Sequence, residues 1–253
     1  MNALFQMWRR EMLHLKHDAG RWLGVILHPV LFWVLLGAGF MNSFRMGGVQ
    51  SEDYLHYAFP GMLLMIIMFT GSFTAMSAIT DRKEGLLMGL FAGPVRPVML
   101  AYGKTLGIAS IVLVQCLLVL PLAGFCGYTL SVAIILSVIA ALSLWIVAFS
   151  AINTAIAWKL SSTYAYHGLM SIVWIPLWLS SGAMFPPDSP WMRIWVQINP
   201  FSHALFALRY ALGAAPLAYM PSLTQAYTGL LTTTFISLTL LTWTTRRIPK
   251  RVQ

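Results

Sequence analysis

Long apolar stretches dominate this chain and limit the folds that are open to it. An α-helix needs about 20 apolar residues to cross the hydrocarbon core of a bilayer. Stretches of this kind lie at 22–41, 57–80, 105–127, 132–158, 166–185 and 222–245. Only 9% of the 253 residues are charged, whereas soluble domains carry about 25%. The sequence therefore predicts an all-α polytopic membrane protein with six transmembrane helices, in a single transmembrane domain over residues 1–253.

The positions of the basic residues predict the orientation of these helices. Loops rich in Lys and Arg stay on the cytosolic side of a membrane. With six spans, 13 basic residues fall on one side and three on the other. The three are Arg45, Arg193 and Arg209. Both termini are therefore predicted to be cytosolic. The net charge of +9 then reflects membrane orientation, and we expect no binding to nucleic acid.

Two regions outside the spans are predicted to be helical. Residues 1–21 place apolar side chains at three- and four-residue spacing opposite basic ones, which is typical of an interfacial helix. Residues 186–213 contain several prolines, with short apolar stretches at 191–198 and 202–213. Neither stretch reaches 18 residues, so both are predicted to be interfacial or re-entrant helices before the last span.

No catalytic or metal-binding pattern is present in the sequence. The six histidines do not follow a zinc-binding spacing. Gly103-Lys104-Thr105 is similar to the end of a phosphate-binding loop, but Val98 stands where that loop needs a glycine. We therefore expect no ATP, cofactor or metal site in this chain. Lys104 is predicted to snorkel to the membrane surface where the third span begins.

The polar residues also argue against a proton-driven carrier. Such carriers depend on ionisable groups inside their spans, and all seven acidic residues are predicted to lie outside the spans. Ser72, Gln115 and Asn153 are polar residues within the spans. They could line a substrate pathway, or they could join helices by hydrogen bonds.

The charged segment at 81–104 is the main cytosolic loop of the predicted topology. Asp81 and Glu84 are predicted to begin a helix in the manner of a capping box. An apolar stripe at helical spacing follows: Leu86, Leu87, Leu90 and Phe91. This helix could lie on the membrane, or it could insert into a groove on a soluble partner.

Several short motifs occur in an order that resembles a known family. They are Phe59-Pro60-Gly61, Asp81-Arg82-Lys83-Glu84-Gly85, Gly93-Pro94-Val95, Gly103-Lys104, Ser181-Gly182-Ala183-Met184-Phe185-Pro186 and Asn199-Pro200-Phe201-Ser202-His203-Ala204-Leu205. With this order and spacing around six spans, the chain resembles the permease subunits of type-2 ATP-binding-cassette (ABC) exporters. The family often has a serine or threonine after the arginine that corresponds to Arg96, and this chain has Pro97 there.

This resemblance implies partner subunits and a role for several segments of the chain. Such permeases form homo- or heterodimers and bind two separately encoded ABC ATPase subunits, which hold the ATP. Residues 1–21 would be the family's connecting helix. The residues that couple to the ATPase would be Asp81, Arg82, Glu84, Leu86, Leu87, Leu90 and Phe91. Residues 186–213 would close the outer end of the path, with Phe185, Pro186, Asn199 and Pro200 in the gate. The expected location is the bacterial plasma membrane.

Two other functions and the identity of the substrate remain open. A membrane-embedded lipid-modifying enzyme would need clustered acids or histidines, and the nearest group is Glu52, Asp53 and His56. A purely structural membrane protein is the other alternative. The aromatic side chains in the spans suit a hydrophobic drug, a lipid or a lipid-linked glycan.

Overall fold

A computed structural model describes residues 3–17, 53–85 and 95–246, together with Leu31 and Leu35. All regular structure in these residues is helical. The helices are α1 (Ala3–His17), α3 (Asp53–Ala75), α4 (Ser77–Lys83), α6 (Pro97–Val119), η1 (Leu120–Cys126), α7 (Val132–Lys159), α8 (Thr163–Leu169), η2 (Met170–Trp174), α9 (Ile175–Leu179), α10 (Pro190–Ile198), α11 (Pro200–Ala211) and α12 (Leu223–Thr245). The prediction of an all-α fold is confirmed.

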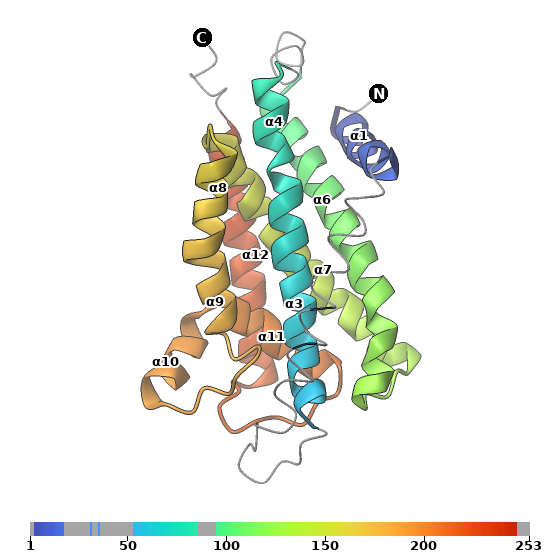
Figure 1. Cartoon of the computed structure of the whole chain (residues 1–253), viewed down its shortest axis with the longest axis vertical. Coiled ribbons are helices and arrows are strands. Elements are labelled where there is room, and N and C mark those ends of the chain that lie inside the picture. Colours follow the sequence, from blue (N-terminus) through green and yellow to red (C-terminus); the bar gives the residue numbers. More distant parts are fainter. Residues whose placement is uncertain (1–2, 18–30, 32–34, 36–52, 86–94, 247–253) are drawn as a thin grey trace.

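The long helices run side by side along the longest axis of the molecule (Figure 1). Helix α1 lies beside the start of α6 at one end, and α10 and α11 lie at the opposite end. A small apolar core joins α1 to the start of α6, the end of α7 and the end of α12; it contains Met7, Leu100, Ala155, Trp158 and Leu241. The N-terminal helix and the end of the last helix therefore lie at the same end of the bundle.

Three segments of the described chain are long and apolar enough to cross a membrane. They are Tyr54–Lys83, Pro97–Cys126 and Val132–Lys159, which confirms the predicted spans at 57–80, 105–127 and 132–158. The predicted span at 22–41 lies outside the described residues, apart from Leu31 and Leu35. The predicted span at 166–185 corresponds to α8–η2–α9, which is shorter than these three segments. The predicted span at 222–245 corresponds to α12, which is rich in threonine and is not one of the three. The total of six spans stays a prediction.

Helix starts in the second half of the chain follow the capping residues of the sequence. The Ser222 side chain accepts a hydrogen bond from Gln225 N, and the two residues form a capping box at the start of α12. The Asn199 side chain accepts one from Phe201 N at the start of α11. The two short helices predicted at 191–198 and 202–213 are observed as α10 and α11. Whether they are re-entrant stays a prediction.

Helix α3 passes through Pro60 without ending. Proline has no N–H group, so the carbonyl of His56 lacks its partner within the helix. The Tyr128 hydroxyl donates to that carbonyl at 2.8 Å. At the next residue a Cβ on Gly61 would lie 2.4 Å from the backbone oxygen of Ala183. Phe59-Pro60-Gly61 is therefore a site of close packing between α3 and the segment that follows α9.

The predicted helix start at Asp81 and Glu84 is wrong. Helix α4 continues the line of α3 (Figure 1) and ends at Lys83, with Glu84 as its C-terminal cap. Gly85 has a φ of 76°, a left-handed conformation that commonly ends helices. Asp81 thus lies in the last turn of a helix. Residues 86–94, which include the apolar stripe at Leu86, Leu87, Leu90 and Phe91, lie outside the described residues, and that helix stays a prediction.

Two glycines on one face of α6 allow α1 to approach closely. A Cβ on Gly103 would lie 2.6 Å from the backbone oxygen of Leu4, and one on Gly107 would lie 2.6 Å from Glu11 Cβ. Glycines four residues apart share a helix face, and small residues of this spacing let helix backbones meet. Gly103 and Gly107 together form what we call the glycine notch, which seats α1 on α6.

The glycine notch gives a direct test of this packing. Gly103→Ala should lower the free energy of unfolding by about 1–3 kcal/mol, because the added methyl group meets backbone atoms that cannot rotate away. Gly168→Ala in α8 is the matched control, since nothing lies within 4 Å of the added Cβ. Thermal unfolding followed by tryptophan fluorescence should separate the two variants. Equal melting temperatures for Gly103→Ala and the wild type would contradict the close approach.

Candidate functional site

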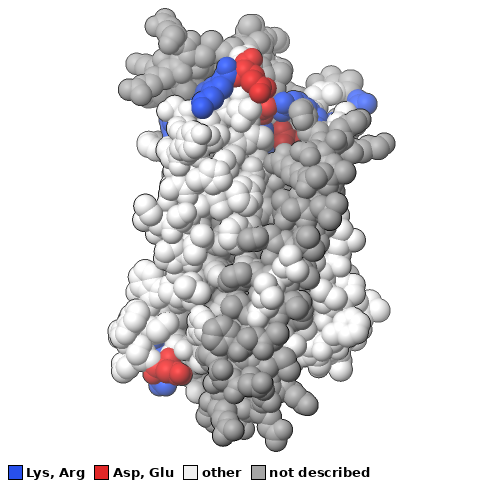
Figure 2. All heavy atoms as spheres, viewed as in Figure 1, with Lys and Arg blue, Asp and Glu red and all other residues white. Residues whose placement is uncertain are grey.

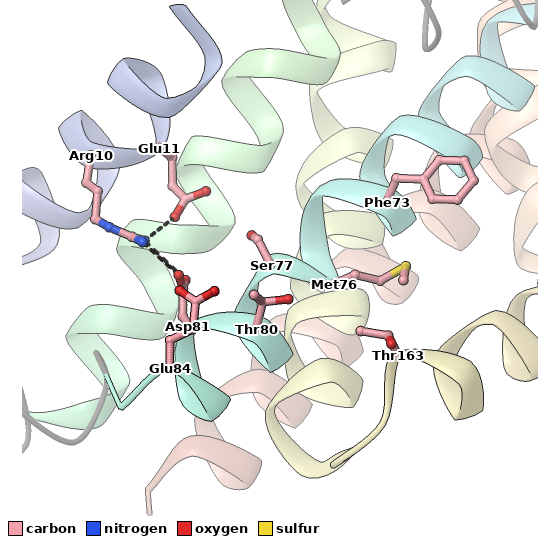
Figure 3. A pocket seen from close by; sticks show the side chains of 9 residues that line it. All are labelled: Arg10, Glu11, Phe73, Met76, Ser77, Thr80, Asp81, Glu84 and Thr163. Carbon is pink, nitrogen blue, oxygen red and sulfur yellow. Dashed lines mark hydrogen bonds and ion pairs between the residues drawn. The ribbon is translucent and has the colours of Figure 1, made fainter. Parts of the chain in front are cut away.

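Four charged side chains meet where α1, α4 and α6 converge. Lys104 Nζ lies 3.0 Å from Glu11 Oε1 and 2.6 Å from Asp81 Oδ2. Arg10 lies 2.7 Å from Asp81 Oδ1 through Nη2 and 3.2 Å from Glu11 Oε1 through Nη1. Figure 3 shows Arg10, Glu11 and Asp81 turned toward one another. We call Arg10, Glu11, Asp81 and Lys104 the ion cluster; its two positive and two negative charges balance.

The ion cluster is buried, which corrects two predictions. The Lys104 side chain has no exposed surface, and those of Glu11 and Asp81 are 6% exposed. Lys104 therefore does not snorkel, because α1 covers it and supplies a carboxylate. Asp81 was expected outside the spans, yet it belongs to the candidate span Tyr54–Lys83. Both acids form ion pairs with cations. Neither is therefore an uncompensated buried acid of the kind that a proton relay uses.

Arg10 closes the ion cluster on its outer side, where 27% of its side chain is exposed. Burial acts to lower the pKa of the guanidinium. The hydrogen bond and charge of Asp81, with the charges of Glu11 and Glu84, outweigh burial and raise this pKa above its ordinary value. Arg10 is therefore always charged, and Asp81 always has at least one fully charged neighbour.

The ion cluster joins segments that are far apart in the sequence. It connects α1, within the predicted connecting helix, to the last turn of α4 and the second turn of α6. The predicted coupling residues run from Asp81 to Phe91, and those at 86–91 lie in sequence between α4 and α6. Removing one member of a buried ion pair leaves an uncompensated charge, which costs about 3–5 kcal/mol. The cluster therefore fastens both flanks of that stretch to α1.

Arg82 points into the bundle next to the ion cluster. Its guanidinium donates hydrogen bonds to the carbonyl oxygens of Trp158 and Leu160 at the C-terminal end of α7. A cation is favourable there because the helix dipole places partial negative charge at that end. Of the predicted coupling residues that the structure describes, Asp81 and Arg82 hold helices together, and Glu84 is exposed. Their contact with an ATPase stays a prediction.

The three predicted pathway residues are buried between helices. Thr70 donates to Gln115 Oε1 at 2.6 Å, which links α3 to α6. Ser72 donates to Asn153 Oδ1 at 3.4 Å, which links α3 to α7. Tyr166 and Trp174 donate to the same oxygen. These groups therefore join helices by hydrogen bonds, which is one of the two alternatives that the sequence leaves open. The other alternative, that they line a substrate pathway, stays a prediction.

At the opposite end of the bundle, the predicted gate residues lie around the start of α11. Asn199 is buried and donates to Leu177 O at 2.7 Å, which ties α9 to α11. Pro200 is the first residue of α11. Phe185 and Pro186 are half-buried in the segment between α9 and α10. The structure places these four residues in one region, and their role as a gate stays a prediction.

Arg209 is a structural residue that the sequence analysis missed. It was counted as an outer-side charge, but it lies in α11 and is 3% exposed. The guanidinium donates to the backbone oxygens of Tyr57 at 3.3 Å and Gly182 at 3.2 Å, and it lies 4.0 Å from the centre of the Tyr57 ring. An arginine inside the apolar stretch at 202–213 was the available signal. Arg209 holds α3, α11 and the segment after α9 together.

The group proposed for a lipid-modifying enzyme does not form a visible site. His56 stacks on Tyr128 with ring centres 3.8 Å apart, and its Nδ1 lies 2.9 Å from Cys126 O. Glu52 lies outside the described residues. Among the residues that are described, no three His, Cys, Asp or Glu side chains come together to hold a metal ion. No observation in this part of the chain favours the enzyme hypothesis.

Comparison with known proteins identifies the family. Residues 2–212 match the family model of the ABC-2 type transporter. The chain belongs to this family. The match includes α1, the ion cluster, the charged segment and the helices of the opposite end through α11, so it confirms the resemblance seen in the sequence motifs.

Two relatives extend this result to the type of subunit. The probable doxorubicin resistance ABC transporter permease protein DrrC of Mycobacterium tuberculosis is 26% identical over 229 residues, which are 87% of this chain and 78% of that protein. The daunorubicin resistance ABC transporter permease protein DrrB1 of Streptomyces coeruleorubidus is 27% identical over 216 residues, which are 82% of this chain and 73% of that protein. The chain is thus a multi-pass membrane permease subunit of the type-2 ABC class, and a transport protein rather than an enzyme.

The ion cluster predicts a large difference between two lysines. Lys104→Met should lower the free energy of unfolding by about 3–5 kcal/mol, because Glu11 and Asp81 stay buried with only Arg10 to balance them. Lys159→Met is the matched control, since Lys159 is exposed at the end of α7 and an exposed charge contributes about 1 kcal/mol or less. Thermal unfolding and the yield of monodisperse protein measure both variants. If Lys104→Met is as stable as Lys159→Met, the ion cluster does not hold α1.

Proposed function

We propose that this chain is the membrane subunit of an ATP-driven exporter, with six spans and both termini in the cytosol. The observation that supports this best is the ion cluster at the end of the bundle where α1, α4 and α6 meet. On the face shown in Figure 2, charged side chains gather at that end, a smaller charged group lies at the opposite end, and the described residues between them are uncharged. This distribution suits a bilayer around the middle and the cytosol at the α1 end.

Energy for transport would come from a separate subunit. Two copies of the permease, or one copy and a paralogue, would pair, and two ABC ATPases would bind ATP and contact the α1 end. Family membership supports an ABC ATPase partner, and the sequence has no phosphate-binding loop of its own. An ATPase that moves residues 86–91 would act directly on α4 and α6. The ion cluster would carry the same movement to α1.

The substrate is proposed to be a hydrophobic drug. The two relatives are named for resistance to doxorubicin and daunorubicin, which favours a drug over the lipid and lipid-linked glycan that the sequence also allows. Both relatives are bacterial permeases, and this supports a location in the bacterial plasma membrane.

The coupling stretch can be tested through the binding of the ATPase. Leu87→Ala with Phe91→Ala should weaken ATPase binding at least tenfold, because apolar anchors at an interface are worth about 1–2 kcal/mol each. Leu136→Ala with Phe125→Ala is the matched control: the same two residue types are replaced, and both are well exposed near the opposite end. Co-purification from detergent and ATP-dependent dye export in vesicles measure the effect.

The outcomes separate the proposed function from its alternatives. The wild type and the control pair should retain the ATPase, and the Leu87/Phe91 pair should lose both the ATPase and export. If the wild-type chain binds no ABC ATPase, the proposed function is wrong. If the Leu87/Phe91 pair still exports at the wild-type rate, coupling does not pass through residues 86–91.

A further inference from the structure

A pocket of about 360 Å³ lies beside the ion cluster. It is bounded by α1, by the last turn of α3, by α4 and by the start of α8. Its lining residues are Arg10, Glu11, Phe73, Met76, Ser77, Thr80, Asp81, Glu84 and Thr163, and Figure 3 shows them around the pocket. The volume is within the range of sites for drug-sized molecules.

The lining changes from acidic to apolar across the pocket. Glu11, Asp81 and Glu84 lie on one side together with Arg10, and Phe73 and Met76 lie on the other (Figure 3). The hydroxyl-bearing residues Ser77, Thr80 and Thr163 supply further polar atoms. An arrangement of this kind suits a molecule that has a charged end and an apolar body.

The sign of that charge follows from the ion cluster. Arg10 and Lys104 balance Glu11 and Asp81. Glu84 is the remaining charged residue of the lining, it is exposed, and it makes no ion pair with the charged groups that the structure describes. Counted together with Lys104, the pocket therefore has an excess of one negative charge. Glu84 is the exposed acid of the lining, and its charge also acts on Arg10.

The apolar side offers an aromatic surface. Phe73 is 37% exposed, and its ring centre lies 6.0 Å from that of Phe69 and 5.8 Å from that of His167. Met76 lies one turn further along and has a flexible, polarisable side chain that adapts to different ligands. A flat aromatic body can stack against Phe73 while Met76 fills the remaining gap.

We infer that this pocket binds an amphipathic organic cation, with its positive group at Glu84 and its apolar body against Phe73 and Met76. The inference rests on the proposed function, because it makes the pocket an entry site for substrate at the cytosolic end of the permease. The inference also narrows the class of drug. The substrate carries a positive charge, and an uncharged drug of the same shape binds more weakly.

The test compares two dyes of similar shape and different charge. Rhodamine 6G is a cation and rhodamine B is a zwitterion at neutral pH, and both have the same flat ring system. Binding to the permease in phosphatidylcholine nanodiscs, without an ATPase, is measured by fluorescence anisotropy, so the binding test does not depend on that partner. Glu84→Gln should weaken rhodamine 6G binding about fivefold to tenfold, which is the effect of one partly exposed charge at close range. It should weaken rhodamine B binding less, because the carboxylate of rhodamine B offsets the positive charge of the same ring system. The effect on rhodamine 6G should shrink as salt is raised.

Two further variants define the site. Phe73→Ala should weaken the binding of both dyes, because each loses the same stacking surface. Asp188→Asn is the matched control for Glu84→Gln, since it removes an exposed acidic charge at the opposite end of the bundle, and it should leave both affinities unchanged. Melting temperatures within a few degrees of the wild type establish that each variant is folded.

Each outcome has one meaning. If wild-type rhodamine 6G affinity is no higher than that of rhodamine B, or if Glu84→Gln and Phe73→Ala both leave it unchanged, the inference is wrong. Failure of the proposed function is distinct, since the dye then binds with the predicted pattern but is not transported when ATP is added.

Discussion

The contact of Lys104 with Glu11 and Asp81 organises the α1 end of this permease. A fully buried lysine is unfavourable unless carboxylates compensate it, and here the two carboxylates come from different helices. One side chain of α6 therefore holds both α1 and the end of α4. The glycine notch makes this possible, because side chains at Gly103 and Gly107 would keep Glu11 away from Lys104.

The same contact links the structure to transport. The stretch at 86–91 lies in sequence between α4 and α6, so any force on it reaches the two helices that Asp81 and Lys104 join. Helix α1 follows them through Glu11 and Arg10. At the other end, Arg209 holds α3 to α11 and to the segment after α9. Helix α3 and its continuation α4 thus run from one polar junction to the other, which gives a continuous element between the proposed ATPase side and the predicted gate.

The sequence predicted the helices well where local signals decide them. Asn199, Ser131 and Ser222 cap the helices that follow them. The apolar stretches gave three spans, although α6 begins at Pro97, within the segment predicted as a loop, and not at 105. It failed at Asp81, because an acidic residue three positions before another suggested a helix start, whereas Gly85 ends the helix. It failed at Lys104 because its acids lie 23 and 93 residues away, and at Arg209 because the backbone oxygens that it binds lie 27 and 152 residues away. The spacing of Gly103 and Gly107 was the only local sign that another helix would cover Lys104.

The ion cluster should make α1 and α6 move as one unit during transport. Spin labels at Leu13→Cys and Met99→Cys, both on exposed side chains, report the distance between these helices in the permease–ATPase complex, diluted with unlabelled chains. Cys116 and Cys126 are buried and should stay unlabelled. We expect one narrow distance distribution that is the same without nucleotide and with trapped ATP, and a broader one in Lys104→Met. A shift of several ångströms between nucleotide states in the wild type would contradict it.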